Sequence, residues 1–176
     1  MKNTILDNIS GEEALTILRK LAKNNTKLKK QIEEQAEQIL RQVDIEETCE
    51  AVYSDLDMLY VEDLWDKSGA HRDGYTSPED MAVEMMEGEL EPHHEEVDKY
   101  FELGMNEEAK LYCMGVLKGI YKYEQESKSE FKDWAADVAR ECYSYLLNKW
   151  RRKSKSKDDL LEMDKFLMKE CSKWAK

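Results

Sequence analysis

The sequence predicts an all-α protein of about eight helices arranged in antiparallel hairpins. Only seven glycines and two prolines occur among the 176 residues, so the chain is poor in the residues that tight turns between strands require. Polar capping residues stand where helices would begin, and apolar residues then recur every three or four positions. The length is that of one domain, so residues 1–176 are expected to fold together.

The first two helices are predicted to form a hairpin within residues 10–43. Ser10 and Glu13 have the spacing of a capping box, in which each side chain accepts a hydrogen bond from the backbone N–H of the other residue. Residues 24–26 interrupt the apolar pattern, which resumes and continues to Val43. Asp44 has the position of a cap for a third helix, expected to run to about residue 59.

An irregular loop is expected at residues 67–76, after one helical turn at 61–65. Ser77 is predicted to cap the next helix, with Pro78 at its first position, where a missing N–H costs nothing. Pro92 is expected to end or kink this helix, because proline lacks a backbone donor and crowds the preceding turn. A further helix would then run to Gly104, and no strand is expected anywhere.

The helix predicted at residues 107–126 is apolar on nearly every side, which indicates a central position in the fold. Gly115 and Gly119 lie four residues apart on it, a spacing that lets another helix approach its backbone closely. Ser127 and Glu130 have the spacing of another capping box, ahead of a helix that reaches Trp150. The last helix is expected to begin near Ser156.

Charge is distributed unevenly along the chain. The net charge is −12, and residues 44–108 carry 22 acidic and only 3 basic side chains. Such a segment repels phosphate, so nucleic acid is a disfavoured partner and a basic protein or peptide a favoured one. Two basic clusters are exceptions, each of which is more commonly a solvated helix surface than a phosphate site. They are Arg19, Lys20, Lys23, Lys27, Lys29 and Lys30, and Lys149, Arg151, Arg152, Lys153, Lys155 and Lys157.

A cytoplasmic protein without a membrane span is expected. No apolar run approaches the roughly 20 residues that cross a bilayer, and the first residues lack the apolar run of a secretion signal. The four cysteines are widely spaced, form no Cys-x-x-Cys motif and fall on the apolar stripes. They are Cys49, Cys113, Cys142 and Cys171. They are therefore expected to be buried thiols in a reducing compartment.

Residues 97–121 place Tyr100 late in one helix, Gly104 at a turn, and Glu108-Ala109 at the start of a second helix. This unit resembles one helix-turn-helix of the tetratricopeptide-repeat (TPR) kind. The bulky residue and the Leu-Gly pair of that pattern are missing, as is its final proline, and no second copy occurs. The resemblance leaves open a helical bundle or a short TPR-like superhelical array. Residues 63–65, 73–75 and 119–121 are also similar to uncharacterised prokaryotic helical proteins.

No catalytic set, metal site or cofactor is predicted. Glu91 and His94 have the Glu-x-x-His spacing of di-iron bundles, but those sites require two copies and further glutamates, and Pro92 lies within the motif. The sequence also lacks a phosphate-binding glycine loop and a nucleophile elbow, which disfavours an enzyme without excluding one.

The candidate ligand-binding residues lie in and beside the expected loop. We prefer an alternative interpretation of these residues, in which they form a surface loop that two aromatic side chains anchor to the helices. The set consists of Trp65, His71, Arg72, Asp73 and Tyr75.

Three functions remain open from the sequence. The first is a helical protein–protein interaction or scaffold module that presents a groove to a peptide or helix, with a basic partner favoured. The alternative is a small-ligand binder or enzyme with its site at the 65–75 loop. The third is a homo-oligomer, for which a large apolar face on the last two helices would be the sign.

Overall fold

The computed structural model describes residues 5–72 and 74–174. By compactness the chain divides into two units, residues 1–42 and 43–176. The described residues form eight α-helices and a two-stranded hairpin, which confirms the all-α prediction. Among these residues, no helix is both long enough and apolar enough to cross a membrane.

The first unit is the predicted helical hairpin. A short 3₁₀ helix, Ile5–Asn8, precedes α1 (Gly11–Asn24) and α2 (Thr26–Leu40), which pack against each other. The capping box forms: the Glu13 N–H donates to Ser10 Oγ at 3.3 Å, and the Ser10 N–H donates to Glu13 Oε2 at 2.8 Å. Asn25 alone joins the two helices, and its side chain caps α2 by accepting from the Leu28 N–H at 3.1 Å.

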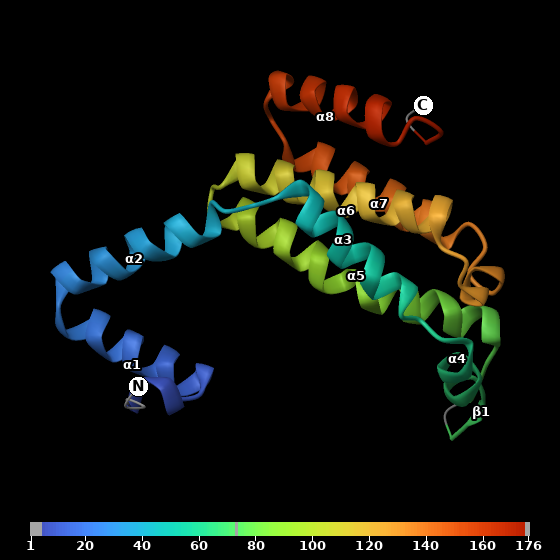
Figure 1. Ribbon diagram of the computed structural model, residues 1–176, viewed down its shortest axis with the longest axis horizontal. Helices are drawn as coiled ribbons and strands as arrows, with labels where there is room; N and C mark the ends of the chain where they lie inside the picture. The colour runs from blue at the N-terminus through green and yellow to red at the C-terminus, as the bar shows by residue number, and fades with distance from the viewer. Residues whose placement is uncertain (1–4, 73, 175–176) are drawn as a thin grey trace. The chain divides into compact units, whose positions relative to one another are not determined.

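The second unit is a bundle built around one central helix (Figure 1). As predicted, that helix is α6, which contacts four other helices: α3, α5, α7 and α8. Consecutive long helices reverse direction, so α3, α6 and α8 run one way and α5 and α7 the other. The elements are α3 (Ile45–Asp57), α4 (Val61–Lys67), α5 (Pro78–Glu102), α6 (Asn106–Glu126), a 3₁₀ helix at Glu130–Asp133, α7 (Val138–Lys153) and α8 (Lys157–Glu170).

The closest packing in this unit joins α3 to α6, and these two helices run parallel rather than as an antiparallel hairpin. They are parallel because α5 returns the chain to the end at which α3 began. A Cβ atom added to Gly115 would lie 2.5 Å from Thr48 Cβ, and one added to Gly119 would lie 2.7 Å from Val52 Cβ. The two glycines therefore allow the close approach that their spacing indicated.

The expectation of an irregular loop at 67–76 is wrong, as is the expectation of no strand. Helix α4 extends to Lys67, and β1 (Gly69–His71) pairs antiparallel with β2 (Gly74–Thr76), with Ala70 opposite Tyr75. Gly69 and Gly74 have φ values of +104° and +146°, which side chains rarely allow. The two glycines thus make this tight hairpin possible, although the sequence lacks the alternating β-branched residues that are typical of strands.

Pro92 does not end its helix, because α5 is continuous from Pro78 to Glu102. Proline removes one backbone hydrogen bond, and the carbonyl that it crowds belongs to Gly88, which has no side chain and open space around it. Leu90, His94 and Val97 are buried on both sides of Pro92. Burial of these side chains keeps the helix intact across the proline.

The capping box expected at Ser127 and Glu130 does not form. The Ser127 hydroxyl donates to Asp57 Oδ1 at 2.5 Å, and Ser129 instead caps the 3₁₀ helix that follows. Helix α7 begins at Val138, after Asp137 in a left-handed conformation with a φ of 65°. The last helix does begin as predicted, because Ser156 accepts a hydrogen bond from the Asp159 N–H at 3.2 Å.

Replacing Gly119 and Gly88 with alanine is expected to change stability in opposite directions. The new Cβ at Gly119 would lie 2.8 Å from the backbone oxygen of Cys49, so α3 must move, and overpacking of this kind costs about 1 to 3 kcal/mol. At Gly88 nothing lies within 4 Å, so alanine should gain about 1 kcal/mol of helix propensity. Urea denaturation measures both variants. An unchanged or raised free energy of unfolding for Gly119→Ala would contradict the packing described.

Candidate functional site

The first unit has an apolar surface that its described residues leave uncovered. Among the residues whose burial is described there (5 and 8–42), none is buried, although α1 and α2 both carry an apolar stripe. Four apolar side chains of α1 are 40 to 46% exposed, and Ile39 of α2 is 68% exposed. We call this surface the hairpin face and define it by Leu15, Ile17, Leu18, Leu21 and Ile39.

Covering the hairpin face would stabilise the hairpin. Full burial of one leucine or isoleucine side chain contributes roughly 1.5 to 3 kcal/mol, so covering side chains that are about half exposed contributes roughly 1 kcal/mol each. A two-helix hairpin offers a single layer, whereas stable domains pack two layers around a core. The hairpin face is therefore the kind of surface that binds another polypeptide.

The hairpin also has opposite charges at its two ends. Residues 19–30, around the turn, contain six basic residues and no acidic residue. Residues 10–18 and 31–42, away from the turn, together contain five acidic residues and one basic residue. The Lys29–Glu33 and Lys30–Glu34 pairs, each 3.6 Å apart, join neighbouring turns of α2 on its exposed surface. Exposed pairs of this kind contribute little to stability, so most of this charge is available to a partner.

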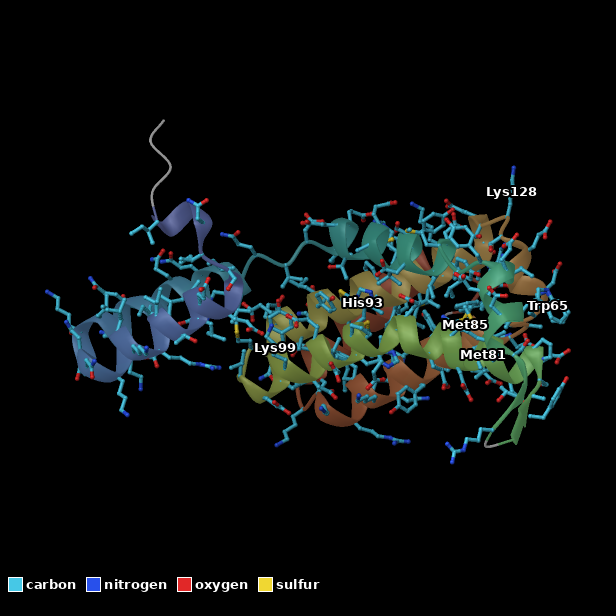
Figure 2. The ribbon with its side chains drawn as sticks, turned by 90° about the horizontal axis from the view of Figure 1, so that it is seen from below. Trp65, Met81, Met85, His93, Lys99 and Lys128 are labelled. Carbon is cyan, nitrogen blue, oxygen red and sulfur yellow. The ribbon has the colours of Figure 1, made fainter. Side chains whose placement is uncertain are left out.

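The described candidate residues of the 65–75 segment are spread over α4, the turn between the strands and β2. Trp65, on α4 (Figure 2), packs edge-on against Trp134, and the ring centroids are 4.9 Å apart. Tyr75, on β2, is 72% exposed. Arg72 is exposed in the turn between the strands. Asp73 and the side chain of His71 lie outside the described residues. Trp65 therefore provides the anchoring contact, and no described member of the set lines one of the cavities discussed below.

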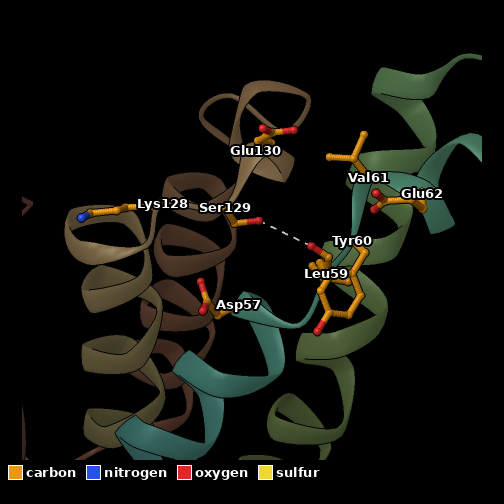
Figure 3. A pocket seen from close by; sticks show the side chains of 8 residues that line it. All are labelled: Asp57, Leu59, Tyr60, Val61, Glu62, Lys128, Ser129 and Glu130. Carbon is orange, nitrogen blue, oxygen red and sulfur yellow. Dashed lines mark hydrogen bonds between the residues drawn. The ribbon is translucent and has the colours of Figure 1, made fainter.

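One cavity of about 350 Å³ lies where α3 leads into α4 (Figure 3). The polar groups around it hold this corner together. Asp57 accepts from the Ser127 hydroxyl, and the Ser129 hydroxyl donates to the Leu59 carbonyl at 3.5 Å. Both hydroxyls therefore link the corner between α3 and α4 to the segment that follows α6. The lining residues are Asp57, Leu59, Tyr60, Val61, Glu62, Lys128, Ser129 and Glu130.

A second cavity, of about 290 Å³, lies between α5 and α7 beside His94. His94 is 6% exposed, and burial together with the nearby positive charge of Lys149 lowers its pKa to about 4. Burial also raises the pKa of the neighbouring Cys142 thiol to about 11. A general base near neutral pH and a reactive thiolate need the opposite shifts, so this pair is unsuited to either role. The lining residues are Glu87, Glu91, His94, Val138, Glu141, Cys142 and Tyr145.

An Asp–His–Tyr relay joins three helices of the bundle. His93 Nε2 lies 3.0 Å from Asp55 Oδ2 on α3, and His93 Nδ1 lies 2.9 Å from the Tyr112 hydroxyl on α6. A neutral imidazole protonated on Nε2 satisfies both bonds. Burial and the nearby Glu96 raise the pKa of Tyr112 to about 12, so the hydroxyl stays protonated and donates. The relay resembles a catalytic triad in order, but its three residues line neither of the two cavities described above, and it acts as a cross-link between the helices.

Sequence reasoning missed both the relay and the exposure of the hairpin face. The relay joins residues 38 and 19 positions apart, a separation that leaves no local signal. Glu91 and His94 have the spacing of a metal-ligand pair, and Glu91 Oε2 lies 3.8 Å from His94 Nδ1. Within the described part of the chain, no group of three or more His, Cys, Asp or Glu side chains is placed to hold a metal ion. The hairpin face remains the strongest candidate site.

His94 is expected to make the protein less stable in mild acid. Its pKa of about 4 in the folded state lies below the ordinary 6.5, so below pH 6.5 the unfolded chain binds a proton that the folded chain does not. Stability is then lost at roughly 1.4 kcal/mol per pH unit until about pH 4. Between pH 7 and 4.5, His94→Phe should lose about 2 to 3 kcal/mol less than the parent in urea denaturation.

The charged groups around the ring are the same in both proteins, so their titration should cancel in the comparison. They are Glu87, Glu91, His93, Asp98, Glu141 and Lys149. Equal losses of stability in the parent and in His94→Phe would show that the imidazole is not held neutral by burial.

Comparisons of this chain with protein-family models, with curated proteins and with solved structures found no match. A function must therefore be inferred from the chain's own residues. Among these sites, the hairpin face is the one with exposed apolar side chains that another molecule would bury.

Proposed function

We propose that this chain is a helical protein–protein interaction module. In this proposal, the hairpin of α1 and α2 docks by the hairpin face onto an apolar helical surface of another polypeptide, and the bundle of the second unit is the folded body that carries it. The observation that carries the proposal is the contrast between the two units. The bundle buries an extensive apolar core, whereas no residue with described burial in 5–42 is buried.

The shape of the hairpin supports a helical partner. Helices α1 and α2 contain 14 and 15 residues, so each is about 21 to 23 Å long. Apolar stripes of this length are long enough to contact the apolar side chains that a partner helix presents at positions i, i+3, i+4 and i+7. A helical hairpin or a long helix laid on the hairpin face would complete a small bundle.

The relation of α5–α6 to the last two helices supports a TPR-like character for residues 97–121. Helix α5 lies against α7 and α6 against α8, each pair running in the same direction. Consecutive helical hairpins in repeat proteins stack in this way.

We also propose a cytoplasmic location, because Cys49, Cys113, Cys142 and Cys171 are buried free thiols, which suits a reducing compartment.

A photo-crosslinking side chain at position 18 should form intermolecular products in native cytosol. Leu18 belongs to the hairpin face, whereas Thr16, two residues away, points to the opposite side of α1 and serves as the matched control. We expect products from position 18 and far fewer from position 16. Mass spectrometry should place the crosslinked partner residue on an apolar helix stripe.

Gel mobility separates intermolecular products from those formed within one chain. Equal yields from positions 16 and 18, or exclusively intramolecular products from position 18, would show that the hairpin face is not a docking surface.

A further inference from the structure

We propose that the bundle has a binding site for a small phosphorylated molecule at the end where α7 turns into α8. The site lies within the second unit, so it does not depend on the proposed function of the hairpin face. Three features of this end favour an anionic ligand. They are two basic side chains that no described carboxylate neutralises, the N-terminus of α8, and a buried indole N–H without an acceptor.

A cavity of about 600 Å³ provides the space for such a ligand. It lies between the turn that joins α5 to α6 and the turn that joins α7 to α8, and Figure 1 shows these two turns at the same end of the bundle. The volume falls within the range of pockets that hold small organic ligands. It also exceeds the volumes of the cavities beside Asp57 and His94.

The structure divides the basic cluster of residues 149–157 into paired and unpaired side chains. Arg152 and Lys155 are exposed and line the cavity, and neither has an ion-pair partner among the described residues. Three other members of the cluster pair with carboxylates of α5 and α8, so their charges are already neutralised. These three are Lys149, Arg151 and Lys153.

Two acidic side chains also line the cavity, but one of them is neutralised. The Asp159 carboxylate accepts a hydrogen bond from the buried Lys110 ammonium at 3.1 Å. Glu102 is the other acidic residue of the lining. Because two unpaired cations face one unpaired carboxylate, the lining has a net positive charge in a protein whose net charge is −12.

The N-terminus of α8 adds backbone donors. Ser156, which lines the cavity, caps this 14-residue helix by accepting from the Asp159 N–H at 3.2 Å. The N–H groups of Lys157 and Asp158 have no acceptor among the described residues. Free N–H groups and the helix dipole attract anions to such an end, and phosphate groups bind there in many proteins.

Trp150 supplies the observation that points to a ligand. It lines the cavity although it is only 1% exposed, and its indole N–H has no hydrogen-bond acceptor among the described residues. A buried indole N–H normally has an acceptor, and an indole can only donate. A phosphate group offers at least three acceptor oxygens and a double negative charge, whereas a carboxylate offers two oxygens and a single charge. Phosphate therefore matches the set of donors best.

An aromatic side chain favours an organic phosphate over the free ion. Phe101 is half-buried in the lining, and the Lys153 ammonium lies 5.6 Å from its ring centroid. The ring offers an apolar surface to the organic group of the ligand. A long nucleic acid is disfavoured because residues 44–108, which carry 22 acidic and 3 basic side chains, would repel its further phosphates.

The first test is an NMR titration of the full chain with inorganic phosphate at neutral pH. The indole N–H signal of Trp150 and the backbone amide signals of Lys157 and Asp158 should shift and saturate, with a Kd on the order of 1 mM. Sodium chloride at the same ionic strength should not cause these shifts. Unchanged signals, or equal shifts with sodium chloride, would overturn the inference.

Two neighbouring arginines provide a matched pair of variants. Arg152→Gln removes a cation from the cavity lining, whereas Arg151→Gln removes the same charge one residue away, from a side chain that pairs with Asp164 and does not line the cavity. We expect Arg152→Gln to weaken phosphate binding about tenfold and Arg151→Gln to weaken it less than about twofold. Equal losses would mean that phosphate is attracted only by net charge, and there would be no site.

The class of ligand is tested with phenyl phosphate and a short single-stranded oligonucleotide. Phenyl phosphate should bind roughly three- to tenfold more tightly than inorganic phosphate, because its ring can contact Phe101. The oligonucleotide should bind more weakly than phenyl phosphate. Equal affinity for the two phosphates would overturn the organic ligand. Tighter binding of the oligonucleotide at Trp150 would identify a nucleic-acid site and overturn the small molecule.

Discussion

The bundle of residues 43–176 depends on the direct approach of the α3 and α6 backbones at Gly115 and Gly119. A Cβ atom at Gly115 would lie 2.9 Å from the backbone oxygen of Ile45, so no other residue fits there without displacing α3. Lys118 and Lys122 reach across the same seam to Glu46 and Glu50, at 2.5 Å each. The seam is therefore apolar and glycine-lined inside and charged at its edge, and it sets the register in which the other helices pack around α6.

Ion pairs in the bundle mostly join one helix to another. Lys110 of α6 is 2% exposed, and besides Glu107 on its own helix it meets Asp159 and Glu162 of α8 at 3.1 and 2.5 Å. Burial alone would lower the pKa of Lys110, but its hydrogen bonds to the carboxylates raise that pKa above the ordinary value. Asp98 of α5 likewise pairs with Lys149 and Lys153 of α7. These pairs link α6 to α8 and α5 to α7, so the charged groups that form them are engaged with one another.

Local signals in the sequence were sufficient for three of the helix starts and for the central helix. Ser10, Ser77 and Ser156 all cap helices, since an N-cap depends on residues within one turn. The helix end expected at Pro92 and the capping box expected at Ser127 are wrong because distant contacts decide the structure there. Buried neighbours keep α5 continuous, and Asp57, 70 residues away, accepts the hydrogen bond of the Ser127 hydroxyl. The strands at 69–71 and 74–76 are too short to show a period. For the candidate site, periodicity revealed the apolar stripes of α1 and α2 but could not tell what covers them.

Covering the hairpin face and stabilising the hairpin are, on the proposed function, the same event. Isolated helices of about 12 to 15 residues are marginal in water, and α1 and α2 fall within that range. Their caps at Ser10 and Asn25 fix where each helix begins, yet a cap typically contributes only about 1 kcal/mol. Docking therefore supplies much of the free energy that orders the hairpin, and part of the binding energy is spent on that ordering. The bundle has its own core and does not depend on this step, so association can change the state of residues 10–42 while residues 43–176 stay folded.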